Sequence, residues 1–361
     1  MPKILGWCAT LSVLTMGIPT AAPAAQAYRL ERATPLPGKS PGWDYLSFDP
    51  KRALLFLGRR AAGVTVFDVR RHRVMMTIAD SAGANMATLA PEFDRGYTTN
   101  GDGSTTVFRL STLRTIGRIK LGDSADAAFL DPATKQLVFT MGDSHQLTFV
   151  DARTGAITGR LHMEAGELEG VAPDGQGGLF VVERDLGKVA KVDAAQRAVV
   201  AEWPLPKCDL PTGMALDHAH GRLFLGCKGD HPVLTVLDVA TGAIVAQPEI
   251  GRGNDGVVFD PSTHRVFTSN GVDGNIVIFD QVTPDRYELV QALTTRPIAR
   301  TMTLDPSTKH IFTMTAEGMV DPAKPVNRRA ATFYPNTFFD DTFTLLEYAP
   351  RDMAPGKADD E

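Results

Sequence analysis

Short runs of alternating apolar and polar residues fill most of the chain, and clusters of turn-forming residues separate them. β-Branched and aromatic residues dominate the runs, whereas Gly, Pro, Asp and Asn dominate the segments between them. No stretch keeps the three-to-four-residue periodicity of an amphipathic helix. The pattern therefore predicts an all-β protein made of many short strands.

The runs recur as a repeat. An Asp-Pro pair ends a short apolar run at 49–50, 131–132, 260–261 and 305–306, and Asp217, Asp174 and Ala90-Pro91 occupy the same place in weaker copies. Three further runs follow each one. The units begin near Gly42, Gly83, Ser124, Glu167, Asp209, Asn254 and Ile298. Seven copies of about 42 residues match the length of a four-stranded propeller blade.

The sixth copy shows the expected strand order. Its four strands are predicted at Gly256–Phe259, Arg265–Ser269, Asn275–Asp280 and Tyr287–Leu293. Asp260-Pro261 forms the first turn, because Pro presets φ and Asp bonds its own backbone.

The seventh copy has a third strand near Thr342–Tyr348 and then lacks a fourth. The segment Tyr28–Pro37 precedes the first copy and has no partner there. We therefore expect a seven-bladed β-propeller whose ring closes when the N-terminal strand joins the last blade, which leaves no open sheet edge at the seam.

The N-terminus reads as a secretory signal over residues 1–27. Lys3 is followed by the apolar stretch Ile4–Ile18, and Ala25-Gln26-Ala27 fits an A-x-A cleavage site. We expect cleavage after Ala27 and export to a periplasm. A membrane anchor is the alternative, but the apolar stretch is short for a span.

The remaining chain is expected to form the propeller over 28–350, followed by a flexible tail at 351–361. No later segment is long and apolar enough for a membrane span. The chain has 37 basic and 42 acidic residues, a net charge of −5, so no nucleic acid partner is expected.

Two cysteines, Cys208 and Cys227, follow the signal. Both are expected at one end of the fifth blade, and an oxidising compartment favours a disulfide between them. The alternative is a copper or zinc site that adds His231.

The segments Val64–Asp68, Leu234–Gly242 and Ile276–Asp280 resemble the YVTN-type repeat of periplasmic YncE-like proteins. The resemblance covers nearly all of residues 28–350 and implies a seven-bladed propeller, but it implies no reaction. The chain departs from that repeat where Asp44, Asp126 and Asp255 often replace the usual Pro near the start of the inner strand, so the resemblance assigns these positions no role.

A ring of polar residues is expected at the mouth of the central channel, on the face where the inner strands start. Counting back five residues from each Asp-Pro position gives Asp44, Asn85, Asp126, Glu169, Thr212, Asp255 and Arg300. Within it, Asn85, Asp126, Glu169 and Asp255 could hold Ca²⁺, Mg²⁺ or Mn²⁺. The alternative is that these side chains cap turns, repeated because the blade is repeated.

The ends of the second strands give another candidate set on the same face. Arg59, Asn100, Glu183 and Asn270 are its polar members considered for ligand contact. Asn-Gly turns alone explain Asn100 and Asn270. A long insertion, Ala316 to Asp341, is also expected on this top face, where it either covers the channel mouth or packs over the seam.

Two functions are compatible with these features. One is a periplasmic protein that binds a small polar ligand or a protein partner through its top face. The other is a divalent-metal-dependent hydrolase, similar to lactonase-type propellers, in which the cation polarises a carbonyl and activates water. No nucleophile elbow, haem-attachment motif or phosphate loop is present.

Overall fold

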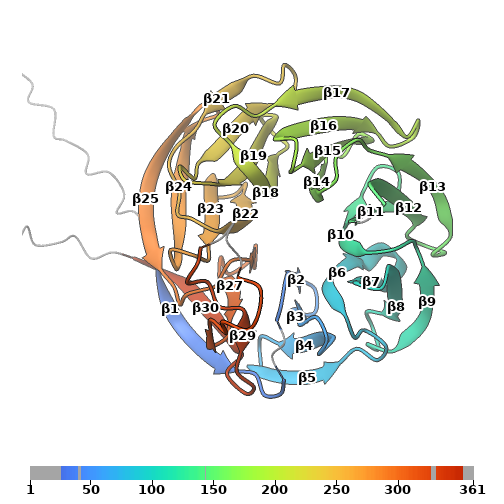
Figure 1. Ribbon diagram of the computed structural model, residues 1–361, viewed down its shortest axis with the longest axis vertical. Coiled ribbons are helices and arrows are strands. Elements are labelled where there is room, and N and C mark those ends of the chain that lie inside the picture. Colours follow the sequence, from blue (N-terminus) through green and yellow to red (C-terminus); the bar gives the residue numbers. More distant parts are fainter. Residues whose placement is uncertain (1–25, 40–41, 143, 327–330, 353–361) are drawn as a thin grey trace, which may run out of the picture.

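Seven four-stranded antiparallel sheets surround one axis in the computed structural model, which confirms the seven-bladed propeller (Figure 1). The structure describes residues 26–352 apart from 40–41, 143 and 327–330. The leader, apart from Gln26 and Ala27, and most of the C-terminal tail lie outside the described residues. Among the described residues the only helical element is η1 (Pro91–Phe93), so none contains a helix that could cross a bilayer.

Each of blades 1 to 4 consists of four strands that are consecutive in the sequence. Blade 1 holds β2 (Leu46–Asp49), β3 (Leu54–Gly58), β4 (Val64–Asp68) and β5 (Arg73–Thr77). Blade 2 holds β6 (Ala84–Ala90), β7 (Arg95–Asn100), β8 (Ser104–Arg109) and β9 (Thr115–Lys120). Blade 3 holds β10 (Ala125–Asp131), β11 (Gln136–Met141), β12 (Gln146–Asp151) and β13 (Ile157–His162). Blade 4 holds β14 (Leu168–Pro173), β15 (Gly178–Glu183), β16 (Lys188–Asp193) and β17 (Ala198–Pro204).

The last three blades complete the ring. Blade 5 holds β18 (Asp209–Asp217), β19 (Arg222–Lys228), β20 (Leu234–Asp238) and β21 (Ile244–Ala246). Blade 6 holds β22 (Asn254–Asp260), β23 (Arg265–Asn270), β24 (Asn275–Thr283) and β25 (Arg286–Thr294). Blade 7 holds β26 (Met302–Leu304), β27 (Ile311–Thr315), β30 (Thr344–Asp352) and, as its outermost strand, β1 (Gln26–Pro35).

The Asp of each Asp-Pro pair caps the turn after an inner strand. The Oδ1 atom of Asp260 accepts the backbone N–H of Ser262 at 3.0 Å, and Asp305 accepts that of Ser307 at 2.8 Å. The Oδ1 atom of Asp49 likewise accepts the backbone N–H of Lys51 at 3.0 Å. These side-chain bonds satisfy backbone donors in the turn, which explains why the residue recurs along the sequence.

The hydrophobic core is divided among the interfaces between neighbouring blades. Between blades 1 and 2, the rings of Phe56 and Phe108 lie 5.6 Å apart, and both side chains are fully buried. Between blades 5 and 6, Phe224 packs against Phe259 at 5.2 Å. Burying one such ring contributes roughly 1.5–3 kcal/mol. A blade therefore gains most of its stability from its two neighbours.

The N-terminal strand closes the ring, as the sequence predicts. β1 pairs antiparallel with β30, from Gln26 opposite Asp352 to Pro35 opposite Thr344 (Figure 1). Tyr28 is buried, and its ring lies 5.4 Å from Phe267 of blade 6. The seam is therefore held by a sheet pairing within blade 7 and by packing against the preceding blade.

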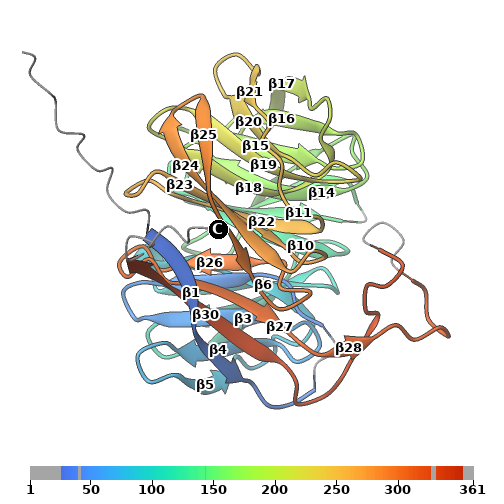
Figure 2. The same cartoon turned by 90° about the vertical axis from the view of Figure 1, so that its left-hand side faces the viewer.

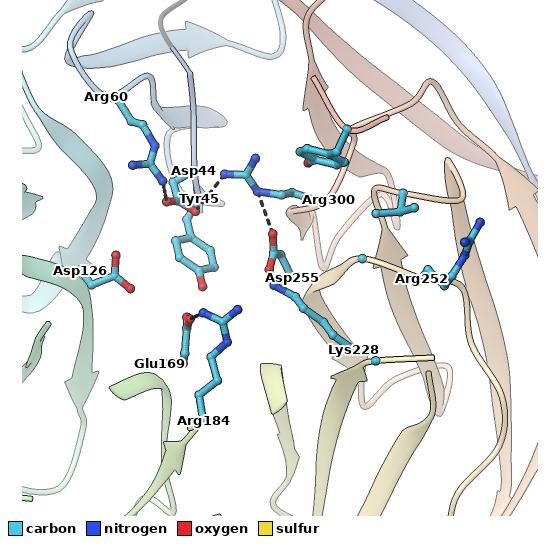
Figure 3. Close-up of a pocket in the computed structure, with 14 residues that line it drawn as sticks. Asp44, Tyr45, Arg60, Asp126, Glu169, Arg184, Lys228, Arg252, Asp255 and Arg300 are labelled. Atoms are coloured by element: carbon cyan, nitrogen blue, oxygen red, sulfur yellow. Dashed lines mark hydrogen bonds and ion pairs between the residues drawn. The ribbon is translucent and has the colours of Figure 1, made fainter. Parts of the chain in front are cut away.

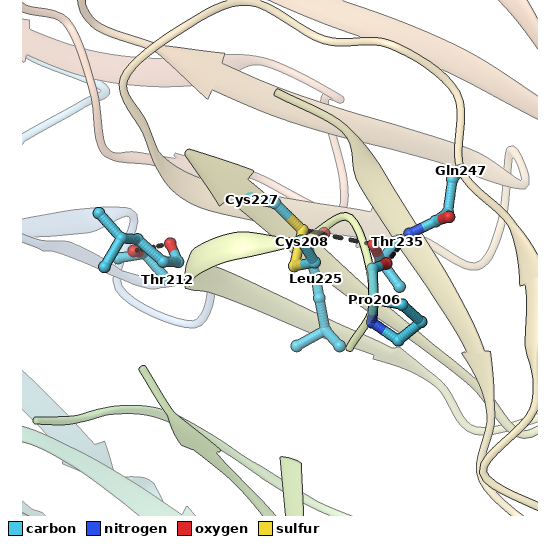
Figure 4. The surroundings of a disulfide bond; sticks show 8 residues. Pro206, Cys208, Thr212, Leu225, Cys227, Thr235 and Gln247 are labelled. Atoms are coloured by element: carbon cyan, nitrogen blue, oxygen red, sulfur yellow. Dashed lines mark hydrogen bonds between the residues drawn. A yellow bond between two sulfur atoms is a disulfide. The ribbon is translucent and has the colours of Figure 1, made fainter. Parts of the chain in front are cut away.

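Cys208 and Cys227 form a disulfide, which confirms the predicted pairing (Figure 4). Cys208 lies just before β18 and Cys227 lies in β19, with their Cα atoms 5.0 Å apart. The bond ties the segment that enters blade 5 to that blade's second strand. It also uses both sulfur atoms, so the alternative copper or zinc site with His231 has no thiolate ligands.

The insertion between β27 and β30 carries a short hairpin, β28 (Gly318–Met319) paired with β29 (Thr337–Phe338). Figure 2 shows this segment projecting from one face of the ring. Its Phe338 packs on Trp43 of the segment before β2, with ring centroids 4.9 Å apart. The described part of the insertion therefore packs across the junction of blades 7 and 1.

Candidate functional site

A cavity of about 470 Å³ lies on the ring axis. Its charged walls come from residues at the start of the inner strands and residues at the end of the second strands (Figure 3). The lining comprises Asp44, Tyr45, Arg60, Asp126, Glu169, Arg184, Lys228, Gly229, Arg252, Gly253, Asp255, Val272, Arg300 and Tyr334. Six of the seven blades and the insertion thus contribute charged or aromatic side chains to one space.

Five of the seven residues expected at the channel mouth line this cavity: Asp44, Asp126, Glu169, Asp255 and Arg300. The other two lie beside it. Asn85 donates from Nδ2 to Oδ1 of Asp126 at 3.1 Å. Thr212 is buried and donates from Oγ1 to the carbonyl of Leu210 at 3.0 Å. Thr212 therefore matches the turn-capping interpretation.

Acidic and basic side chains alternate along one side of the cavity. Arg60 Nη2 lies 2.6 Å from Asp44 Oδ2, and Arg300 Nη2 lies 3.8 Å from Asp44 Oδ1. Arg300 Nε lies 2.8 Å from Asp255 Oδ2, and Lys228 Nζ contacts Oδ1 of the same carboxylate. This charge chain, from Arg60 through Asp44, Arg300 and Asp255 to Lys228, crosses blades 1, 7, 6 and 5.

Arg300 is the centre of the charge chain. Its guanidinium lies 5.7 Å from the ring centroid of Trp43, and its Nη2 donates to the carbonyl of Trp43 at 2.7 Å. The surroundings act on its pKa in both directions: burial lowers it, but the charges of Tyr334, Asp44 and Asp255 outweigh burial and leave it raised. Arg300 is therefore a fixed positive charge at the mouth.

The opposite side of the cavity holds carboxyl groups with shifted pKa values. Burial raises the pKa of Glu169 to about 8, assisted by the charge of Asp126 and opposed by that of Arg184. Burial also raises the pKa of Asp126 to about 6, together with the negative charge of Asp44. Arg184 Nη1 binds Glu169 Oε1 at 2.7 Å, whereas Asp126 has no ion pair with any described residue.

Two tyrosines complete the lining. Tyr45 precedes β2 and projects into the middle of the cavity between Asp126, Glu169 and the charge chain (Figure 3). Burial raises its pKa well above the ordinary value, and the charges of Glu169 and Asp44 raise it further. Tyr334 comes from the insertion and hydrogen-bonds Arg300. The insertion therefore both contributes to the cavity wall and packs over the seam.

The predicted set at the ends of the second strands lies outside the cavity lining. Arg59 is buried beneath the seam, where its guanidinium lies 4.4 Å from the Phe343 ring and donates to the carbonyl of Pro37 at 3.2 Å. Glu183 is buried inside blade 4, and burial raises its pKa to about 7, together with the charge of Glu202. Neither side chain reaches the axis.

The two asparagines of that set serve their own turns and strands. Asn100 donates from Nδ2 to Ser104 Oγ at 3.1 Å and accepts from Thr98 Oγ1 at 2.8 Å. Asn270 donates to Asn275 Oδ1 at 2.8 Å and accepts from Asn254 Nδ2 at 3.1 Å. Both are fully buried, which agrees with the structural explanation of the Asn-Gly turns.

Three of the cavity residues that sequence reasoning missed directly follow residues of the second-strand set. Arg60, Arg184 and Lys228 directly follow Arg59, Glu183 and Cys227, and they line the cavity. Successive side chains of a strand point to opposite faces. A side chain that packs inside the blade is therefore followed by one that faces the ring axis. The other missed residues are Tyr45, Gly229, Arg252, Gly253 and Val272. Tyr334 belongs to the insertion that the sequence places on the top face.

The proposed divalent-cation set does not fit a resident metal. Glu169 and Asp255 are already bound to Arg184, and to Arg300 and Lys228. Asn85 directs its amide donor, not its oxygen, toward Asp126. No group of three or more His, Cys, Asp or Glu side chains in the described part of the chain is arranged to hold a metal ion. Two of the four proposed ligands are therefore already paired with cations of the protein itself.

Comparisons with known proteins support the fold. No family model matches the chain, and no curated protein matches it. Among solved structures, it is similar to the hydrazine synthase of Kuenenia stuttgartiensis, with a TM-score of 0.66 and 16% identity over 77% of this chain and 94% of that one. It is also similar to a chain of the mitotic checkpoint complex, with a TM-score of 0.68 and 13% identity over 85% of this chain and 95% of that one. At such low identity these likenesses show a β-propeller and nothing finer.

Proposed function

We propose that this protein is an exported, YncE-like propeller that binds a small polar ligand in the axial cavity. One observation carries the proposal: charged side chains from separate blades converge on one partly enclosed space of about 470 Å³. That volume is typical of small-molecule sites, in which a few convergent polar groups set specificity. The disulfide supports export, because such bonds persist in oxidising compartments.

The preorganisation of the charges supports binding more than it supports a structural role. Salt bridges that serve stability alone can be replaced by apolar packing at little cost. Here Asp44, Asp255 and Arg300 are largely withdrawn from solvent, and yet they face a cavity. Retaining polar groups there is expected when an incoming polar ligand will use them.

Thermal unfolding in the presence of small polar compounds tests this proposal. The mature chain beginning at Tyr28 is screened against sugars, dicarboxylates, amines and amino acids. A bound compound raises the midpoint in proportion to its concentration relative to Kd. The size of the rise should change in Asp255→Asn and stay the same in Glu288→Gln, a matched carboxylate removal on the exposed outer strand β25. A midpoint that no compound moves would contradict a small-molecule role and favour a protein partner.

Export is tested separately. The proposal requires that the secreted protein begin at Tyr28 and fractionate with the periplasm. A mature N-terminus elsewhere, or retention with the membrane, would contradict the signal over residues 1–27.

A hydrolase is the second candidate, and the pKa values of Asp126 and Glu169 favour it. Carboxyl groups with pKa values of about 6 and about 8 can exchange protons near neutral pH. A lactone would be hydrolysed by the wild type and not by Asp126→Ala or Glu169→Ala. The metal-dependent form further requires bound Ca²⁺, Mg²⁺ or Mn²⁺, so protein that stays metal-free after dialysis against micromolar concentrations of these ions would exclude it.

A further inference from the structure

The formal charges of the cavity wall are unevenly distributed. Along the charge chain, three cations (Arg60, Arg300 and Lys228) share two carboxylates (Asp44 and Asp255). This side therefore carries one positive charge more than its internal pairing neutralises. The fifth basic residue of the wall, Arg252, does not add to the excess, because it makes a two-point ion pair with Asp273 at 2.7 and 2.9 Å.

The other side has the opposite imbalance. Arg184 is shared between Glu169 at 2.7 Å and Glu167 at 3.4 Å, and Asp126 has only the neutral amide of Asn85. In blade 2, the position that corresponds to Arg60 and Arg184 is occupied by Gly101, so this blade contributes no cation there. Figure 3 shows Asp126 across Tyr45 from Arg300, Asp255 and Lys228. The cavity thus has a negative wall at blade 3 and a positive wall at blades 5 to 7.

We propose that the ligand is a zwitterion the size of a free amino acid. Its ammonium lies beside Asp126 and Tyr45, and its carboxylate lies against Lys228 and Arg300. This inference rests on the proposed binding function and specifies the class of ligand. A zwitterion places a charge of opposite sign against each wall at once, whereas a simple anion or a simple amine leaves one wall with an uncompensated charge.

The low exposure of the site to solvent strengthens its preference for a zwitterion over a simple anion or a simple amine. Asp44, Glu169 and Asp255 keep less than a fifth of their side-chain surface exposed. Ion pairs formed in such a setting are stronger than pairs in bulk water. The aromatic face of Tyr45 between the two walls can also attract an ammonium group, as aromatic side chains do in sites for organic cations.

The test is titration calorimetry with the proteinogenic L-amino acids on the mature protein. The tightest of them is then compared with its amide, which lacks the carboxylate, and with its N-acetyl derivative, which lacks the ammonium. We expect the unmodified amino acid to bind at least about tenfold more tightly than either derivative, because each modification removes one of two ion pairs.

Two variants test which wall binds the ammonium and which binds the carboxylate. Asp126→Asn, which is isosteric, should weaken the amino acid about tenfold and leave the N-acetyl derivative almost unchanged. Lys228→Met should weaken both compounds that carry a carboxylate and leave the amide unchanged. Asp255 keeps Arg300 in that variant, so the charge chain remains paired. Unfolding midpoints measured on both variants separate lost binding from lost folding.

The outcomes distinguish the two proposals. If sugars or dicarboxylates bind in the cavity and amino acids do not, the zwitterion inference is overturned and the binding function stands. The inference is also overturned if amino acids bind and Asp126→Asn has no effect. If nothing in either panel binds the wild type, both proposals fail.

Discussion

Asn85 of β6 donates a hydrogen bond to Asp126 of β10 across the interface between blades 2 and 3, with Nδ2 and Oδ1 3.1 Å apart. The three other cavity carboxylates each contact an Arg or a Lys, but this one contacts an amide. The pair therefore marks the place where the alternation of charge around the mouth is interrupted. The consequences can be measured.

Replacing Asn85 by Asp should destabilise the protein in a pH-dependent way. The change sets a second carboxylate against Asp126, and like charges that close raise one another's pKa. We expect a loss of roughly 1–3 kcal/mol near pH 8 that largely disappears near pH 5, where one of the two groups is protonated. Denaturant unfolding at both pH values measures it. Asn85→Ala is the control, because it removes the hydrogen bond without adding charge, and its loss should depend on pH much less steeply.

Glu169 should make the wild type less stable as pH rises. Its pKa is about 8 in the folded protein and near 4.5 in the unfolded chain, so the folded state holds the proton more tightly. The stabilisation that protonated Glu169 provides is therefore complete below about pH 4 and is lost as pH rises through about 8. Glu169→Gln removes this titration, so its stability should fall less steeply between about pH 6 and pH 9.

The control for that comparison is Glu183→Gln. Glu183 also has a raised pKa, of about 7, but it lies inside blade 4. Its replacement should also flatten the pH dependence of stability, without changing the binding of any cavity ligand. If stability falls equally steeply with pH in Glu169→Gln and in the wild type, the raised pKa of Glu169 is contradicted.

Tyr28→Ala should weaken the closure of the ring. The side chain is buried against Phe267, and its backbone N–H and C=O bond the Gln291 side chain of β25 at 2.7 and 3.0 Å. Removing a large buried aromatic group costs about 3–5 kcal/mol. Removing residues 353–361 is the comparison, because it leaves every residue of β30 in place, and it should change the unfolding midpoint little. A midpoint unchanged by Tyr28→Ala would contradict a seam held by β1.

Loss of the disulfide should lower stability by roughly 3 kcal/mol, as expected when a cross-link closes a loop of this size. Cys208→Ser combined with Cys227→Ser makes the change, and denaturant unfolding measures it. In the wild type, intact mass should be two hydrogens below that of the reduced chain. A mass equal to that of the reduced chain would contradict the bond.

Arg300→Gln should be among the most damaging changes at the cavity. It leaves Asp44 and Asp255 facing one another with less compensating charge, and breaking a buried ion pair costs about 3–5 kcal/mol. Adding Asp255→Asn should recover part of that loss. A double variant no more stable than Arg300→Gln alone would contradict the assignment of Arg300 as the shared cation.

The fold followed from the sequence because its determinants are local and repeated. Asp49, Asp260 and Asp305 each cap a turn two residues ahead, so the blade boundaries are visible in the chain itself. The closing strand was predictable for another reason: a propeller with a missing outer strand needs one, and Tyr28–Pro37 had no other partner.

The site was predictable only in part. Counting from the turns located Asp44, Asp126, Glu169, Asp255 and Arg300, because each lies five residues before the Asp at the turn after its inner strand. The same counting on the second strands gave Arg59 and Glu183, one residue short of Arg60 and Arg184. At a strand end, a single residue decides whether a side chain enters the blade or faces the axis.

Other features of the site depend on contacts between blades. Whether Lys228 pairs with Asp255 is decided by the separation of blades 5 and 6, and no spacing within the chain reports that distance. Tyr334 lies in an irregular insertion whose path has no repeat to guide it. Such pairings arise only when the ring is closed.

The antiparallel pairing of β1 with β30 has a topological consequence. It brings Tyr28 opposite Pro350, so the backbone already runs almost as a continuous loop. A peptide linker between these positions would make that loop covalent, and new termini could then be opened at a capped turn such as the one after Asp260. The protein is therefore suited to circular permutation, with each blade in turn able to serve as the first.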